Sequence, residues 1–198
     1  MHKKDPAGLP LQNASLISAF TVQGFVVIYP FLHVYLAVFV VRIADDHALN
    51  KAYCDEWLAY YQYWIGAKVV SGMAASRLIA EMEEHAAEEL EHAEMLAKRI
   101  LELGGTPVLS PKEWYKESTC GYLVPQDDDS KAILAQNLQG ERCAIEVYNK
   151  LLEMVKDKDL LTAHVLRKIL QDEVEHEQDL EDIGLDMKYI TADCGCAG

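Results

Sequence analysis

Residues 89–92, Glu-Leu-Glu-His, and residues 173–176, Glu-Val-Glu-His, decide the fold of this 198-residue chain. Each stretch contains Glu-x-x-His, which places a carboxylate and an imidazole one turn apart on the same face of a helix. One copy would be a weak signal, because most Glu residues of a Glu-rich helix simply face solvent. Two copies on separate helical segments are a much stronger one. This repetition predicts two helices that each present a ligand pair to a common site.

Two further glutamates follow the same repeat. Glu56 and Glu141 are separated by almost the same interval as Glu89 and Glu173, and each is on the helix predicted to precede a Glu-x-x-His helix. The turn predicted at Gly72 lies almost midway between Glu56 and Glu89, and the turn of the second hairpin lies midway between Glu141 and Glu173. Because residues equidistant from a turn lie at the same height in antiparallel helices, all four carboxylates are expected at one level.

Four-helix bundles with two iron or two manganese ions use this pattern: one Glu from each of two helices and Glu-x-x-His from each of the other two. Four carboxylates offset the charge of two divalent ions, and one imidazole per ion adds a nitrogen ligand that suits iron or manganese. Glu89 and Glu173 are expected to bridge the ions. The alternative is that these are six unrelated surface residues. It would require the spacing of the glutamates about the turn to agree in both hairpins by chance. The predicted ligands are Glu56, Glu89, His92, Glu141, Glu173 and His176.

Helical periodicity continues from about residue 45 onward, with Gly and Pro confined to the joints. A connection as long as residues 105–126 indicates a crossover between distant ends of a bundle. Gly184 is expected to end the last helix. The fold class is therefore all-α, a four-helix bundle over residues 45–184 with an apolar extension (1–44) and a Cys-containing tail (185–198). The predicted helices cover about 45–71, 74–103, 130–155 and 160–183.

The overall charge excludes some partners. The chain has 18 Lys and Arg against 32 Asp and Glu, a net charge of -14, which opposes binding to nucleic-acid phosphates and suits a metal cation. Five cysteines are an odd number in a chain of ordinary size, which is not typical of a secreted disulfide framework. A reducing compartment, the cytoplasm, is the expected location.

The N-terminal region is unlike the rest, because residues 6–41 contain no Asp, Glu, Lys or Arg. The stretch from Leu16 to Val41 would span roughly 39 Å as a helix, more than a bilayer core requires. Three interpretations stay open: a membrane anchor, an apolar extension packed against other subunits, and an upstream segment absent from the mature protein. Pro30 weakens a straight membrane span.

Three side chains near the predicted ligands have possible supporting roles. Tyr63 and Tyr148 each follow a predicted terminal Glu by seven residues, which keeps them on the ligand face. They are either core aromatics or hydrogen-bond donors to a metal ligand on the adjacent helix. His85, one turn before Glu89, is either a polar packing residue or a further ligand or channel group.

From about Leu49 to Ile183 the chain resembles the Dps-like ferritins, also called thioferritins, of the ferritin-like di-iron superfamily. This resemblance implies a bacterioferritin-type centre with two Fe ions per subunit inside each bundle, and a hollow homo-oligomeric cage that is a dodecamer. Manganese remains an alternative by ligand type. The motifs that carry the resemblance are residues 55–61 (Asp-Glu-Trp-Leu-Ala-Tyr-Tyr), 89–94 (Glu-Leu-Glu-His-Ala-Glu), 141–146 (Glu-Arg-Cys-Ala-Ile-Glu) and 173–177 (Glu-Val-Glu-His-Glu).

The resemblance also implies a function and a role for two cysteines. Cys120 and Cys143 match a cysteine pair near the metal centre, and we expect a redox pair there. The implied activity is a ferroxidase that oxidises Fe(II) with hydrogen peroxide or oxygen, stores ferric iron and protects against oxidative stress. The alternatives are a rubrerythrin-type peroxidase or manganese catalase without storage, and a non-catalytic structural or DNA-protecting shell. The acidic charge opposes the DNA-binding version.

Overall fold

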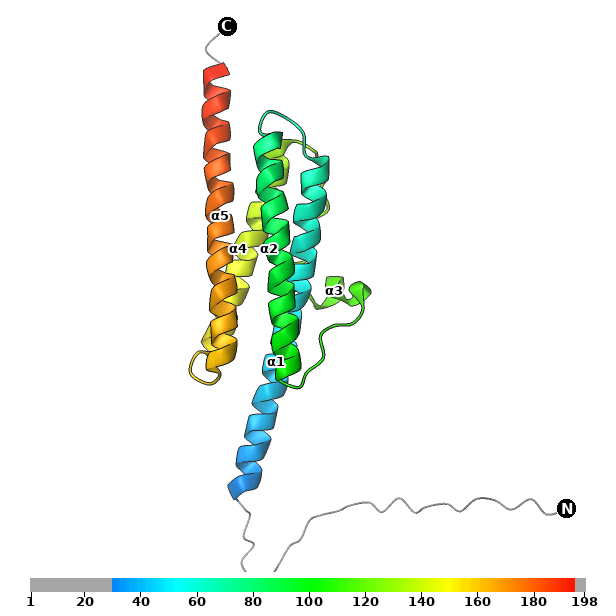
Figure 1. Cartoon of the computed structure of the whole chain (residues 1–198), viewed down its shortest axis with the longest axis vertical. Helices are drawn as coiled ribbons and strands as arrows, with labels where there is room; N and C mark the ends of the chain where they lie inside the picture. Colours follow the sequence, from blue (N-terminus) through cyan, green and yellow to red (C-terminus); the bar gives the residue numbers. More distant parts are fainter. Residues whose placement is uncertain (1–29, 195–198) are drawn as a thin grey trace, which may run out of the picture. The chain divides into compact units, whose positions relative to one another are not determined.

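The computed structural model describes residues 30–194, and the surroundings of side chains from residue 46 to 189. This part of the chain is helical and has no strand beyond an isolated bridge between Ser71 and Asp129. The all-α prediction is therefore confirmed. The helices, labelled in Figure 1, are α1 (Pro30–Val69), α2 (Ala75–Glu102), α3 (Pro111–Glu117), α4 (Ser130–Val155) and α5 (Leu160–Cys194).

The chain divides into two compact units, residues 1–38 and 39–198. Of the first unit, only residues 30–38 are described, and they are helical. The predicted helix start near residue 45 is wrong, since α1 already begins at Pro30, a residue that suits the first turn of a helix. Most of the apolar stretch 16–41, with its three interpretations, lies outside the described residues. Within them, no helix is both long and apolar enough to cross a membrane.

The second unit contains two helical hairpins, α1–α2 and α4–α5 (Figure 1). Gly72 forms the first turn with φ 102°, a left-handed conformation that other residues rarely adopt. A Cβ atom at Gly72 would also lie only 2.8 Å from Ser130 Oγ. Asp129 caps α4, because its side chain accepts a hydrogen bond from the Lys131 backbone N–H.

The connection between α2 and α4 crosses the length of the bundle, as predicted. It leaves α2 at the end far from the α1–α2 turn, yet α4 begins beside that turn. Ser71 fixes this start, since its backbone N–H donates to Asp128 O at 2.7 Å and its carbonyl accepts from Ser130 N at 3.0 Å. The short helix α3 was not predicted. Its Trp114 stacks on Trp57 of α1, with ring centroids 4.8 Å apart, and so attaches the crossover to the bundle.

The apolar core consists of two clusters. One contains Tyr148 with Leu96, Leu166 and Ile169, and the other contains Tyr63 with side chains such as Leu78 and Leu180. Both tyrosines are almost completely buried. Their hydroxyl groups reach the carboxylates described below, so the polar site borders both clusters.

Helix α5 does not end at Gly184, which corrects the predicted end of the bundle. The helix continues to Cys194, ten residues further. A Cβ atom at Gly184 would lie 3.2 Å from Leu134 Cδ2 of α4, so the missing side chain permits close packing of the two helices. Gly here is a packing residue and not a helix terminator. Cys196 of the predicted tail lies outside the described residues.

Candidate metal centre

The structure brings the six predicted ligands together inside the bundle. They form two groups whose potential ligand atoms all lie within 4.8 Å of one another. Each group has one terminal Glu and one His, and both groups share Glu89 and Glu173. This sharing is the arrangement expected of two bridging carboxylates. The groups are Glu56, Glu89, His92 and Glu173, and Glu89, Glu141, Glu173 and His176, and every member is buried.

The donor atoms of these groups fit metal ions. Buried polar atoms are normally hydrogen-bonded, because an unpartnered one costs free energy. In the part of the chain that the structure describes, one oxygen of each of the four glutamates finds no hydrogen-bond partner, and neither does one nitrogen of the two histidine ligands. Carboxylate oxygen and imidazole nitrogen are ligands for divalent iron and manganese. The atoms without a hydrogen bond are Glu56 Oε2, Glu89 Oε1, Glu141 Oε2, Glu173 Oε1 and His176 Nδ1, and their closest charged contacts are with each other or with His92 Nδ1, at 3.2 to 3.7 Å.

The negative charge of the buried glutamates also favours the binding of positive charge, either protons or metal cations. Burial raises the pKa of Glu56 well above its ordinary value, and the charge of Glu89 raises it further. Burial and the charges of neighbouring glutamates, first Glu89, raise the pKa of Glu173 in the same way. For His176, burial opposes protonation, but the proximity of Glu141 and Glu89 outweighs it and raises the pKa to about 12. Protons therefore offset part of the negative charge, and metal ions that bind here would have to displace them.

The two tyrosines hold the two terminal glutamates in place. Tyr63 of α1 donates a hydrogen bond to Glu141 Oε1 of α4, and Tyr148 of α4 donates to Glu56 Oε1 of α1. Burial and the charge of Glu141 raise the pKa of Tyr63 well above its ordinary value, so the hydroxyl group keeps its proton. Each tyrosine engages one oxygen and leaves the other, Oε2, directed at the site without a hydrogen bond.

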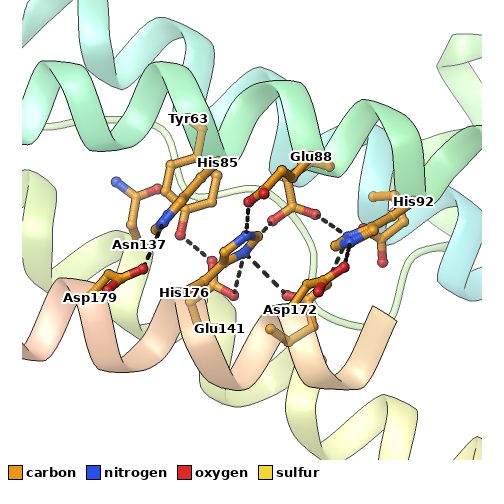
Figure 2. A network of polar contacts seen from close by, with 12 residues as sticks. Tyr63, His85, Glu88, His92, Asn137, Glu141, Asp172, His176 and Asp179 are labelled. Atoms are coloured by element: carbon orange, nitrogen blue, oxygen red, sulfur yellow. Dashed lines mark hydrogen bonds and ion pairs between the residues drawn. The ribbon is translucent and has the colours of Figure 1, made fainter. Parts of the chain in front are cut away.

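Two acidic residues that the sequence analysis did not single out orient the histidines. Asp172 Oδ2 lies 3.1 Å from His92 Nε2, and Glu88 Oε2 lies 2.7 Å from His176 Nε2. A carboxylate on one ring nitrogen fixes the orientation of the ring and leaves the other nitrogen, here Nδ1, for a metal. Figure 2 shows both contacts. A signal was present, because Glu88 and Asp172 directly precede Glu89 and Glu173 and therefore share their repeat.

The cysteines predicted as a redox pair form a disulfide bond between Cys120 of the crossover and Cys143 of α4. Both line a cavity of about 120 Å³ that also reaches Glu56, Glu89, Glu141 and Glu173. Asp55 anchors the loop, since its Oδ1 accepts hydrogen bonds from the backbone N–H groups of Thr119, at 2.8 Å, and Cys120, at 2.7 Å. Cys54 is a free, buried thiol.

His85 lies next to the site but belongs to neither group of ligands. Its ring stacks on that of His176 with centroids 4.0 Å apart, whereas the His92 ring is 6.0 Å from His176. Figure 2 shows His85 close to Asp179 and on the other side of His176 from His92. Burial and the charge of His176 lower the pKa of His85 to about 3, so its ring is neutral.

A four-helix bundle with a long crossover and a buried cluster of Glu and His is the arrangement of the ferritin-like proteins, and the comparison with known proteins leads to the same class. The Ferritin-like domain family matches residues 47–188. The chain belongs to this family, which includes iron-storage ferritins and proteins of the Dps type.

Three relatives are similar over most of the bundle. The solved structure of a dodecameric thioferritin, the bacterioferritin-related protein from Bacteroides fragilis, superimposes with a TM-score of 0.76 at 43% identity, covering 77% of this chain and 90% of that one. A DNA protection during starvation protein from Pyrococcus furiosus is 32% identical over 68% of this chain and 74% of its own length. A bacterioferritin from Desulfovibrio desulfuricans is 33% identical over 72% and 75%, respectively.

Proposed function

We propose that this chain is a ferroxidase with a di-iron centre, which oxidises Fe(II) with hydrogen peroxide or oxygen and stores the ferric product in a homo-oligomeric cage. The observation that carries the proposal is the pair of buried ligand groups that share Glu89 and Glu173. Two ions held by shared carboxylates are close enough to act together on one oxidant. Membership of a family with iron-storage and Dps-type proteins supports the same function.

The residues have distinct roles in this proposal. Glu89 and Glu173, which both groups share, would hold both ions, while Glu56 and Glu141 would each hold one ion through the oxygen that its tyrosine leaves unbonded. His92 and His176 complete the two ends, and we assign metal binding to their Nδ1 atoms because Nε2 faces Asp172 or Glu88. Iron would supply the redox chemistry, in which two ferrous ions would each give one electron to hydrogen peroxide, and two protons would complete its reduction to two waters.

The first test compares the wild-type chain with Glu89→Gln/Glu173→Gln, which keeps the shape of both side chains and removes their charge. We expect the wild type to bind two ferrous ions per chain without oxygen and to oxidise them far faster than buffer does. The variant is expected to lose both properties. The control is Glu94→Gln/Glu181→Gln, which makes the same charge change at exposed positions of the same helices, α2 and α5.

The outcome against the proposal is an undiminished oxidation rate in Glu89→Gln/Glu173→Gln. Circular dichroism of the variant separates loss of the site from loss of the fold. Iron content by elemental analysis also tests the metal, because protein from its native host should contain iron and not manganese.

We further propose that the site uses hydrogen peroxide at least as readily as oxygen. The position of the disulfide supports this preference. Cys120 and Cys143 line the cavity that reaches the four glutamates, so an oxidant in this cavity touches both the disulfide and the metal ligands. Stopped-flow mixing with each oxidant tests the idea. We expect Cys143→Ser to change the peroxide rate, while Cys54→Ala, which alters a buried thiol outside this cavity, does not. A strong preference for oxygen that Cys143→Ser leaves unchanged would contradict it.

Assembly into a dodecamer is part of the proposal. The support is the 43% identity to a dodecameric thioferritin across 77% of the chain. Twelve chains of 22.3 kDa give a particle of about 270 kDa, which light scattering after size exclusion measures directly. The net charge of -14 opposes DNA binding by such a particle.

A further inference from the structure

We propose a third metal site, on the face formed by α2 and α5, in which Glu81, His85 and Asp179 bind one divalent first-row transition ion. Ligand atoms of these three residues lie within 4.8 Å of one another. His85 Nε2 is 3.5 Å from Glu81 Oε1 and 3.8 Å from Asp179 Oδ2. The site shares no ligand with the proposed di-iron centre and therefore goes beyond the proposed function.

The state of His85 points to a ligand. The residue is only 1% exposed, and its Nδ1 atom, which is not the atom facing the carboxylates, has no hydrogen-bond partner among the described residues, so Nε2 is the atom through which the ring meets its polar neighbours. The other nitrogen, Nε2, faces the two carboxylates at distances longer than a good hydrogen bond, which is about 2.7–3.2 Å for N–H donors. A buried histidine is normally hydrogen-bonded. A cation between Nε2 and the two carboxylates would give Nε2, Glu81 and Asp179 a common partner, while Nδ1 stays outside the proposed site.

The carboxylates of the site are also available to a cation. The ion-pair contacts of Glu81 and Asp179 are with the His85 ring, whereas Arg77, the base one turn before Glu81, pairs with Asp186. Burial, and after it the charges of Asp179 and Glu84, raise the pKa of Glu81 although the charge of Arg77 lowers it, so acidic groups outweigh the nearby base. One imidazole and two carboxylates suit Fe(II), Mn(II), Co(II) or Zn(II), with water in the remaining positions.

A small cavity connects the proposed site to His176. His85 and His176 line it together, and its volume is about 80 Å³. The rest of its wall is acidic: Glu81, Glu84, Glu88, Asp172, Glu175 and Asp179. An ion at the third site would therefore lie beside the ring of His176, at one end of the proposed centre (Figure 2).

The repeat within the chain shows that the di-iron centre does not require these polar residues. At the interval that separates Glu89 from Glu173, the counterparts of Glu81 and His85 are Val165 and Ile169, and the counterpart of Asp179 is Met95. All three counterparts belong to an apolar cluster, and Ile169 is fully buried in it. The two ends of the centre thus have the same ligand types but different surroundings. The polar group at the His176 end has a separate role, and metal binding accounts for it.

The test counts the Co(II) ions that the full-length protein binds without oxygen, by equilibrium dialysis and elemental analysis. The variant Glu81→Gln/Asp179→Asn removes both carboxylates of the site. The matched control, Glu83→Gln/Asp182→Asn, makes the same charge change on the same two helices at exposed residues outside the group. We expect three ions per chain in the wild type and the control, and two in Glu81→Gln/Asp179→Asn.

The dissociation constant of the third ion should rise at least about 100-fold in Glu81→Gln/Asp179→Asn, because loss of even an outer partner of a ligand costs about 10–100-fold. Equal numbers of ions and equal affinities in the wild type and this variant would overturn the proposal. The count also separates the two sites. If Glu81→Gln/Asp179→Asn binds one ion fewer than the wild type, the third site is supported, whatever the total in the wild type. The number of ions that this variant still binds tests the di-iron centre separately, because two are expected there.

Discussion

The α1–α2 and α4–α5 hairpins supply the same ligand types at repeated positions, but they differ wherever the chain meets other surroundings. Beyond the His92 end lies an apolar cluster with Ile169, and beyond the His176 end lies polar His85. Asp159 caps α5, whereas α2 begins without a side-chain cap. The repeat therefore covers the ligands and the side chains that bond to them, such as the two tyrosines, but not the residues one or two turns further along the helices. Beyond those residues, the side chains around each end of the site differ between the two hairpins.

The largest expected effect comes from making the second hairpin resemble the first. Ile169→His places a polar ring in the apolar cluster, where it loses packing and lacks a hydrogen-bond partner. We expect the free energy of unfolding of the metal-free protein to fall by about 2–4 kcal/mol. Leu161→His, at an exposed position of the same helix, is the control. Equal denaturant midpoints for the two variants would show that this end of the centre tolerates polarity as the other end does.

The second prediction tests whether the two ends bind metal equivalently. Glu88→Gln and Asp172→Asn each remove the carboxylate that orients one histidine ring. We expect either change to weaken the binding of one ion about 10–100-fold, and the other ion much less. Calorimetric titration with Co(II) measures both constants. Glu91→Gln on the exposed side of α2 should leave them unchanged, and a similar loss there would mean that the effect is general electrostatics.

The third prediction concerns the cap that only the second hairpin has. Asp159 Oδ1 accepts hydrogen bonds from the backbone N–H groups of Leu161 and Thr162, and Oδ2 accepts one from Arg99 at 2.7 Å. We expect Asp159→Ala to lower the free energy of unfolding by about 1 kcal/mol at pH 7.

The effect of Asp159→Ala should depend on pH in a defined direction. Burial raises the pKa of Asp159, but the hydrogen bonds with Thr162 and Arg99 outweigh burial and lower it from 3.8 to about 2. A lowered pKa stabilises the fold above the ordinary value, and this contribution disappears as the pH falls through the folded value. The difference between Asp159→Ala and the wild type should therefore shrink between about pH 4 and pH 2. A difference that is constant over this range would exclude the charge as its cause.

The smallest expected effect is that of removing residues 1–41. Every proposed ligand and both hairpin turns lie after residue 41, so the bundle should fold, bind metal and assemble without this segment. We expect unchanged metal content and particle size, and higher solubility because an uncharged apolar surface is removed. Light scattering on both forms and membrane fractionation of the full chain measure this. An insoluble truncation would place the segment in the core or in a subunit interface.

The fold class and the grouping of the ligands follow from spacing alone. Antiparallel helices bring residues equidistant from a turn together, so Glu56, Glu89, Glu141 and Glu173 could be assigned to one level from their positions in the sequence. The crossover also follows from its length. These predictions depend on distances along the chain, which helical geometry converts directly into distances in space.

What depends on contacts between helices could not be predicted in the same way. Gly184 looked like a helix terminator, and only the approach of Leu134 shows why a glycine is needed inside α5. Asp179 lies near His85 because α5 packs against α2 with a particular rotation about its axis. This rotation cannot be read from the spacing of residues along the chain. The disulfide between Cys120 and Cys143 depends on where the crossover lies, and the resemblance alone could only pair these residues.

The crossover has a consequence for the order of folding. Each hairpin forms from neighbouring segments, but the Tyr63–Glu141 and Tyr148–Glu56 contacts join residues 78 and 92 positions apart. Long-range contacts form late, because the chain must first close a large loop. Neither ligand group is complete within one hairpin, since each takes a bridging glutamate from the other. Iron held as we propose would therefore bind tightly only after the hairpins dock, and its binding free energy would act on docking, the step that carboxylate repulsion opposes.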